Sequence, residues 1–177
     1  MALLDPRLVA RQKGITLEVV AYRSQAVGFD PRSGEGARRR GGRFNPPQSF
    51  PVLYLCLTRP CVVAEITRLA GRQGIDVVDL LPRELWRISG TLTNVLDLTA
   101  QATLGDLNLT AQDLVRDDYG LTQELGTAAH AHGIRAIRTP SATGVDHVLA
   151  LLVDNLAGTV LAVDLLDTWT GAGDLDT

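Results

Sequence analysis

Four polar side chains stand at positions where a folded core has no need of them. They are Arg23 in VVAYRS, Arg43 after two glycines, Tyr54 in the apolar run VLYLCL and Glu65 in PCVVAEI. A guanidinium presents a planar fork of donors that suits a phosphate or diphosphate. A tyrosine ring can stack on an aromatic group, and a carboxylate can accept hydrogen bonds from ribose hydroxyls. These residue types predict a site for an anionic, aromatic, ribose-containing ligand, and NAD fits that description.

Glu65 is the most specific of these signals. Its neighbours Val62 and Ile66 are core residue types, and carboxylates are rarely buried unless they are paired. A carboxylate beside a cleft can stabilise positive charge at an anomeric carbon, which is the transition state of glycosidic cleavage. The alternative is a salt bridge from Glu65 to Arg68 or to an arginine of the preceding loop.

Arg43, Tyr54 and Ser141 each have a plain structural alternative. Gly41-Gly42 could form an ordinary turn that leaves Arg43 in solvent, and Tyr54 could be a core tyrosine with a satisfied hydroxyl. Ser141, which follows Pro140 at the start of a turn, could bind a ligand amide or only fix its own loop.

Several other kinds of chemistry are not indicated. His130 and His132 lie two residues apart on a predicted helix and face different directions, so no metal site is predicted. His147 is interpreted as a strand residue with an ordinary partner. The sequence contains no P-loop, no G-x-S-x-G elbow, no CxxC and no Rossmann fingerprint. NAD would therefore be handled without the hydride-transfer architecture.

The elements that must position these residues follow from apolar periodicity and from Gly, Pro and capping signals. Helices are predicted at 5–14, 58–71, 99–105, 110–116 and 121–132, and strands at 15–23, 52–57, 75–80, 84–92, 94–99, within 133–141, at 146–155 and at 159–166. Strands outnumber helices and do not alternate strictly with them. We therefore expect an α+β fold with a mixed, mostly antiparallel sheet core and flanking helices. The long segment 24–51 is predicted to be a functional loop.

The chain of 177 residues fits one domain, with a core at about 15–166 and a frayed tail at 167–177. The net charge of −3 does not predict a general nucleic-acid surface. Five arginines nevertheless crowd into residues 32–43, which indicates a site for a small anion or an acidic partner. Cys56 and Cys61 lie in apolar sequence and are expected to pack as small hydrophobic side chains, reduced as in the cytoplasm. Because no signal peptide or membrane-spanning run is present, a cytoplasmic location is predicted.

The motifs resemble those of the RES-domain toxins, a family named for an arginine, a glutamate and a serine. The resemblance spans about residues 20–165. It is carried by Tyr22-Arg23, SGEGARRRGGRFNPP (33–47), PVLYL (51–55) and Glu65, and more loosely by QELGTAAHAHGIRAIRTPSA (123–142). Phe44 stands where the family often has tryptophan, which keeps an aromatic ring.

This resemblance implies a fold related to ADP-ribosyltransferases and roles for individual residues. Arg23 and Arg43 would bind the phosphates and ribose of NAD. Tyr54 would orient or stack on the nicotinamide, and Glu65 would support the oxocarbenium-like transition state, so that Arg43, Tyr54 and Glu65 form the catalytic set.

The family serine has two candidate positions in this chain. Ser141 is the better match and would join the residues that bind NAD. The segment Gly120–Thr122 could instead occupy that place, and the serine would then be missing.

The resemblance also implies a function, namely a toxin of a type II toxin–antitoxin system that depletes NAD by cleaving the nicotinamide–ribose bond. The acceptor would be water or inorganic phosphate, so phosphate is a candidate co-substrate and NAD is the substrate rather than a cofactor. The partner would be a separate Xre-like antitoxin in a higher-order complex, with no direct nucleic-acid binding by this chain. Two alternatives remain open: mono-ADP-ribosylation of a host protein, and a non-catalytic nucleotide-binding module.

Overall fold

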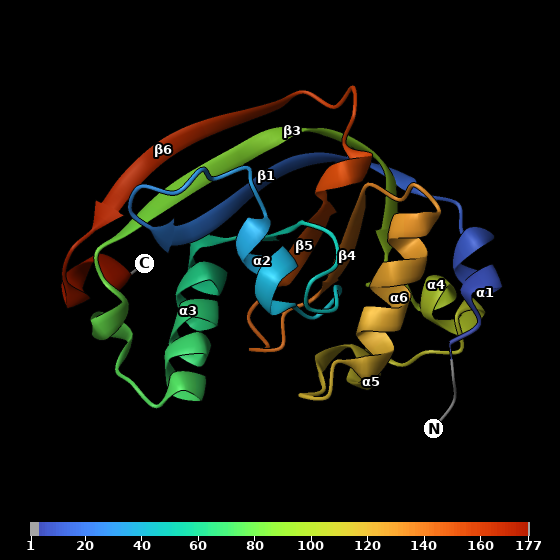
Figure 1. Ribbon diagram of the computed structural model, residues 1–177, viewed down its shortest axis with the longest axis horizontal. Coiled ribbons are helices and arrows are strands. Elements are labelled where there is room, and N and C mark those ends of the chain that lie inside the picture. Colours follow the sequence, from blue (N-terminus) through green and yellow to red (C-terminus); the bar gives the residue numbers. More distant parts are fainter. Residues whose placement is uncertain (1–3, 177) are drawn as a thin grey trace.

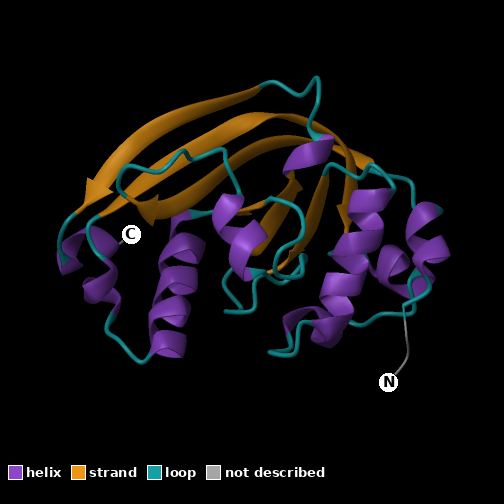
Figure 2. Cartoon of the chain, viewed as in Figure 1, coloured by secondary structure: helices purple, strands orange, loops and turns teal. Residues whose placement is uncertain are grey.

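Six strands form one mixed sheet in the computed structural model, which describes residues 4–176 (Figures 1 and 2). The strands are β1 (Ile15–Ala26), β2 (Val52–Cys56), β3 (Arg83–Asp97), β4 (Ala136–Pro140), β5 (His147–Leu152) and β6 (Leu161–Trp169). Within these residues β3 and β4 are the one parallel pair, and the other neighbours are antiparallel. The predicted α+β class with a mostly antiparallel sheet is confirmed.

Six α-helices and three short 3-10 helices flank the sheet within the same described range. The α-helices are α1 (Pro6–Ala10), α2 (Glu35–Arg40), α3 (Arg59–Gln73), α4 (Gln101–Asp106), α5 (Ala111–Val115) and α6 (Gly120–Ala131), and the 3-10 helices are η1 (Val77–Leu80), η2 (Val153–Asn155) and η3 (Ala172–Leu175). No helix in residues 4–176 is long and apolar enough to cross a membrane.

The strand pairings close on themselves. The order is β1-β2-β5-β4-β3-β6, and β1 also pairs with β3. The long strands β1, β3 and β6 arch together over one side of the molecule in Figure 1, whereas β2, β5 and β4 form a shorter group. The two groups meet weakly between β1 and β2, whose only pairing in the described chain is Tyr22 with Cys56. The strands diverge at this point and leave room for a cavity.

The helix α3 packs one face on the sheet and turns another toward this gap. Thr58 begins the helix by accepting a hydrogen bond from the Cys61 amide at 3.4 Å, as its residue type predicts. Val62 and Ile66 are buried in a cluster with Trp169. Glu65 follows Val62 by three positions and lies at the edge of this apolar face, so burial of Val62 and Ile66 fixes where the carboxylate points.

Three of the predicted strands differ in the structure. The prediction of a strand at 75–80 is wrong, because residues 77–80 form η1. The Asp76 carboxylate accepts a hydrogen bond from the Val78 amide, and the Asp79 carboxylate accepts one from the Asp76 amide, both at 3.1 Å. Such capping favours a helical turn over a strand. The strands predicted at 84–92 and 94–99 are one strand, β3, that runs through Asn94 at a φ of 56°.

The loop predicted at 24–51 and the C-terminal segment are more regular than expected. The strand β1 continues to Ala26, and α2 forms where Glu35 pairs with Arg38 one turn later at 2.9 Å. The strand β6 continues past the expected core boundary to Trp169, which is 1% exposed. The large apolar side chain of Trp169 supplies the physical reason, since its burial against α3 holds this end of the chain.

Candidate active site

A cavity of about 450 Å³ lies where β1 and β2 separate, between α2, α3 and the loop after β4. All five residues selected from the sequence line it: Arg23, Arg43, Tyr54, Glu65 and Ser141. They come from β1, from the loop before β2, from β2 itself, from α3 and from the end of β4. The fold thus brings together side chains that are up to 118 positions apart in the sequence.

The loop that carries Arg43 is folded tightly against β2. Gly41 ends α2 at a φ of 78°, a conformation that favours glycine. The Gly42 amide donates to the Asn45 carbonyl at 2.9 Å, and the turn is closed by the reverse bond at 3.4 Å. A Cβ atom on Gly42 would lie 2.6 Å from the Tyr54 hydroxyl oxygen, so only glycine lets the loop approach this ring.

The Tyr54 hydroxyl makes two hydrogen bonds with this loop. It accepts a hydrogen bond from the Phe44 amide at 2.8 Å and donates one to Asn45 Oδ1 at 2.9 Å. Burial raises the pKa of Tyr54 well above its ordinary value, so the hydroxyl stays protonated. The structure therefore gives Tyr54 a positioning contact, while its ring still lines the cavity. Its predicted role toward nicotinamide stays a prediction.

We expect Tyr54→Phe to lower the free energy of unfolding by about 1–3 kcal/mol, because a buried amide and a buried carbonyl oxygen lose their partner. Urea unfolding measures this change. Tyr22→Phe is the matched control, since Tyr22 also lines the cavity but its hydroxyl makes no hydrogen bond with residues 4–176. An equal loss of stability in both variants would contradict the positioning role of the Tyr54 hydroxyl.

Arg43 is held at one wall of the cavity by two backbone carbonyls and an aromatic ring. Its Nη1 donates to the carbonyls of Leu114 at 2.9 Å and Arg116 at 2.7 Å. The guanidinium carbon lies 4.6 Å from the centre of the Tyr119 ring, within the range of a cation–π contact. Burial lowers the pKa of Arg43, although the group remains cationic at neutral pH.

Glu65 and Ser141 form the direct contact at the centre of the site. The Ser141 hydroxyl donates to Glu65 Oε1 at 2.7 Å and is itself 3% exposed. The second carboxylate oxygen, Oε2, accepts no hydrogen bond from the described part of the chain. The salt bridge from Glu65 to Arg68 that the sequence left open is not formed within residues 4–176, where Arg68 pairs with Asp117 instead. One carboxylate oxygen is thus fixed and the other is available to a ligand.

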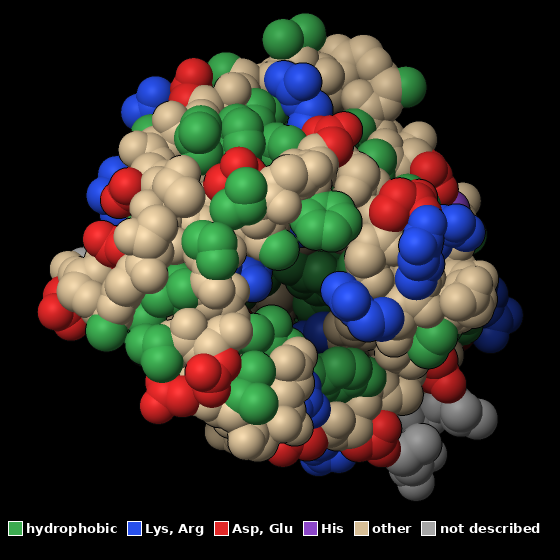
Figure 3. Space-filling view, turned by 60° about the vertical axis from the view of Figure 1, so that its left-hand side comes forward, with side chains coloured by type: hydrophobic (Ala, Val, Ile, Leu, Met, Phe, Trp, Pro, Cys, Tyr) green, Lys and Arg blue, Asp and Glu red, His purple; other side chains and the backbone are tan. Residues whose placement is uncertain are grey.

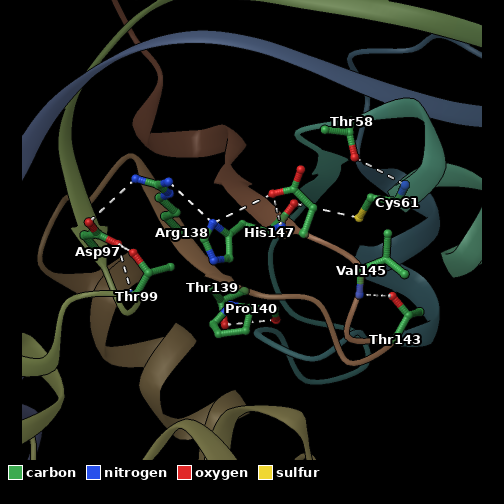
Figure 4. Close-up of polar contacts among 11 residues, drawn as sticks. Thr58, Cys61, Asp97, Thr99, Arg138, Thr139, Pro140, Thr143, Val145 and His147 are labelled. Atoms are coloured by element: carbon green, nitrogen blue, oxygen red, sulfur yellow. Dashed lines mark hydrogen bonds and ion pairs between the residues drawn. The ribbon is translucent and has the colours of Figure 1, made fainter.

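The segment that presents Ser141 is held on both sides, and Figure 4 shows residues that flank it, from Arg138 to His147. Before it on β4, Arg138 lies between Asp97, at 3.9 Å, and His147 Nδ1, at 3.4 Å. After it, the Thr143 amide donates to the Ser141 hydroxyl oxygen at 3.1 Å, which closes a tight turn. The orientation of Ser141 toward Glu65 is therefore set by the loop before any ligand binds.

Positive charge dominates the lining of the cavity. Five arginines line it against a single carboxylate, Glu65: they are Arg23, Arg40, Arg43, Arg68 and Arg72. Burial lowers the pKa of Arg23 to about 10, and the charge of Arg83 acts in the same direction. Arg23 still carries its charge near pH 7 because that pKa lies well above neutral. In the space-filling view a hollow opens near the centre, with basic and hydrophobic side chains around it (Figure 3).

The lining residues that were not identified as candidates from the sequence include Arg68, Arg72 and Tyr119. Arg68 and Arg72 follow Glu65 by three and seven positions, which places all three on one helical face. That spacing was an available signal for the arginines. Tyr119 had none, because only the packing of the α5–α6 connection brings it beside Arg43.

The structure also distinguishes the two positions considered for the family serine. Ser141 lines the cavity and contacts Glu65. Gly120–Thr122 form the first turn of α6, do not line the cavity, and the Thr122 hydroxyl donates to the Tyr119 carbonyl at 3.1 Å. Ser141 is thus the position of the two that lies in the cavity, and its assignment as the family serine stays a prediction.

The fold and this site are those of a RES-domain protein. The model of the RES domain family matches residues 20–170, so the chain belongs to that family. It is 34% identical over 151 residues to the protein named NAD(+) phosphorylase MbcT from Mycobacterium tuberculosis, and equally to that from Mycobacterium bovis. The match covers 82% of this chain and 81% of each relative. The crystal structure of the M. tuberculosis MbcT-MbcA toxin-antitoxin complex superposes with a TM-score of 0.79 at 27% identity, covering 91% of each chain.

Proposed function

We propose that this protein is a toxin that depletes NAD by breaking the bond between nicotinamide and ribose, with inorganic phosphate as the acceptor. The observation that carries the proposal is the cavity with five arginines around one carboxylate, which suits a ligand rich in phosphate. The relatives named NAD(+) phosphorylase and the toxin-antitoxin complex of similar fold support the same function.

The arginines of the site bind NAD, and Glu65 stabilises the charge that develops during the reaction. Arg23 and Arg43 bind the phosphates and the adjoining ribose of NAD. Glu65 Oε2, which no residue in the described chain occupies, faces the ribose and stabilises the positive charge that develops at the anomeric carbon. The Ser141 hydroxyl holds the other oxygen, so the carboxylate does not have to reorient during the reaction.

Phosphate suits this cavity better than water as the acceptor. An attacking water must give up a proton, and Glu65, which serves the ribose, is the only carboxylate among the lining residues, which include no histidine. Hydrogenphosphate is already an anion and needs no base. Its negative charge is also attracted by the arginines, whereas neutral water gains little from them.

The proposal is tested by a proton and phosphorus NMR time course of NAD with the purified protein, with and without inorganic phosphate. Turnover that requires phosphate and yields ADP-ribose 1″-phosphate and nicotinamide is the expected result. Turnover without phosphate that yields ADP-ribose would replace the phosphorylase with a hydrolase. ADP-ribose found on protein would favour mono-ADP-ribosylation, and absence of any turnover would favour a binding module.

We also propose an antitoxin of the Xre-like class as the partner, acting with the toxin in the cytoplasm within a higher-order complex. The helix α2 offers a basic surface at the mouth of the cavity, where Arg39 and Arg40 are exposed and Arg38 is half-buried. An acidic segment of the antitoxin on this surface would cover the site and prevent NAD from entering.

Replacing Arg38, Arg39 and Arg40 with glutamine is expected to weaken antitoxin binding by about tenfold or more at low salt, since it removes a local positive field. Isothermal titration with the cognate antitoxin measures this. The matched control replaces the exposed cations Arg7, Arg11 and Lys13, which removes the same charge from the α1 region. Unchanged affinity of the α2 variant for the antitoxin would contradict the proposed contact.

A further inference from the structure

Three arginines converge on the connection between α5 and α6. Arg68 donates to Asp117 Oδ1 at 2.7 Å, and Arg72 donates to the same oxygen at 3.4 Å and to the Tyr119 hydroxyl. The Tyr119 ring also lies 4.6 Å from the Arg43 guanidinium carbon and 5.3 Å from that of Arg72. The Asp117 carboxylate and the Tyr119 hydroxyl therefore contact the basic face of α3, which Arg68 and Arg72 form.

The arginines around the Tyr119 hydroxyl favour a negatively charged oxygen at this position. Burial raises the pKa of Tyr119, but the hydrogen bond from Arg72 and the charges of Arg43 and Arg72 outweigh it, so the pKa is lowered. The Asp117 side chain is 79% exposed, and an ion pair with such an exposed carboxylate contributes little net stability, so an anion can displace it at small cost. A small oxyanion that enters would find donors in place and a weakly held carboxylate to displace.

The basic face lies beside the reacting end of the proposed site. Arg68 and Arg72 follow Glu65 on α3 by roughly 4.5 Å and 10.5 Å of helix rise. Arg68 and Arg72 share a helical face with Glu65, whereas Arg23 comes from β1. The arginines of α3 therefore lie on the same element as the carboxylate that would face the anomeric carbon.

We propose that Arg68, Arg72 and Tyr119 form the subsite for the acceptor phosphate, and that Asp117 occupies the two arginines until phosphate displaces it. This inference rests on the proposed function. A phosphate oxygen would form a bond to the anomeric carbon while the carbon–nitrogen bond to nicotinamide breaks. The electron pair of that bond goes to the pyridinium nitrogen, which gives neutral nicotinamide and ADP-ribose 1″-phosphate.

The competing interpretation is that the arginines only tether the α5–α6 connection. The two interpretations predict opposite signs for Asp117. A tether is weakened by loss of either partner, so Arg72→Gln and Asp117→Asn would impair the protein in the same way. A subsite with a resident competitor loses affinity when Arg72 is replaced and gains affinity when Asp117 is neutralised.

The experiment measures KM for phosphate at saturating NAD, and KM for NAD at saturating phosphate. We expect Arg72→Gln to raise KM for phosphate at least about tenfold, the worth of one charge-assisted hydrogen bond, and Asp117→Asn to lower it about threefold. In both variants KM for NAD should stay within about twofold. The matched control is Arg87→Gln, which breaks a similar arginine–aspartate pair with Asp164, at 3.0 Å between β3 and β6, and should change neither constant.

Other outcomes separate this inference from the proposed function. A raised KM for phosphate in both site variants would overturn the subsite in favour of a tether. NAD cleavage by the wild type without any phosphate requirement would overturn the subsite and leave NAD cleavage standing. If the wild type cleaves no NAD, phosphorus NMR titration of inorganic phosphate decides: weaker binding in Arg72→Gln with tighter binding in Asp117→Asn supports the subsite, and equal binding in all variants overturns it.

Discussion

Glu65→Gln is expected to lower kcat for NAD cleavage by about 10³-fold while NAD binding changes little. The amide keeps the size of the side chain and can still accept the hydrogen bond that Ser141 donates to Oε1 at 2.7 Å. It loses the negative charge that stabilises the anomeric carbon in the transition state, where charge is largest. The turnover rate and the dissociation constant for NAD, measured separately, show which of the two has changed.

The matched control for this variant is Glu124→Gln, on the exposed side of α6 and outside the cavity lining. It removes the same charge and should keep full activity. In cells, expression of the wild type alone should arrest growth and Glu65→Gln should not. Normal turnover by Glu65→Gln would remove Glu65 from the reaction, and equal losses of rate and NAD affinity would make it a binding residue only.

Gly126→Ala is expected to have the largest effect on the fold around the site. Gly126 lies in α6 and is buried, and a Cβ atom there would lie 1.7 Å from the Phe44 carbonyl oxygen. The contact is with backbone, so α6 and the Arg43 loop have to move apart. We expect a loss of about 3 kcal/mol or more in the free energy of unfolding, at the upper end for overpacking. Chemical denaturation measures it.

The matched control is Gly71→Ala in α3, where an added Cβ meets nothing within 4 Å. That change should stabilise the protein slightly, by about 0.5–1 kcal/mol, because alanine favours the helix. The two substitutions are chemically identical and should have opposite signs. Gly126→Ala should also reduce NAD cleavage, because Phe44 adjoins Arg43 in the loop. A stable Gly126→Ala variant with normal activity would contradict the close packing of α6 on that loop.

The sequence was sufficient to predict the residues of the site that break a local pattern. Glu65 is a carboxylate in an apolar stretch of helix, and Arg43 follows two glycines, so each is visible without any tertiary contact. The start of α3 was predictable for a similar reason, since Thr58 and Pro60 suit the first turn of a helix. These signals are local. Glu65 and Arg43 line the cavity, and Thr58 caps the start of α3, as expected.

The features that the sequence did not predict depend on tertiary contacts or on competing local bonds. The spacing of Arg68 and Arg72 places them on the face of Glu65, but their contacts with Asp117 and Tyr119 form only when the α5–α6 connection packs against α3. In residues 75–80 the β-branched composition favours a strand, but the hydrogen bonds of Asp76 select a 3-10 turn. Side-chain types and their spacing do not reveal these contacts.

The pairing of β2 has a consequence for how the chain is made. This strand carries Tyr54 and anchors the Arg43 loop, yet it meets the earlier strand β1 at one position and pairs along its full length with β5, near residue 150. Proteins are synthesised from the N-terminus, so a chain that is still growing on the ribosome lacks the strand that holds β2 in place. Ser141 is also absent until late. We therefore expect a nascent chain to be harmless, with NAD cleavage beginning only after most of the protein has left the ribosome.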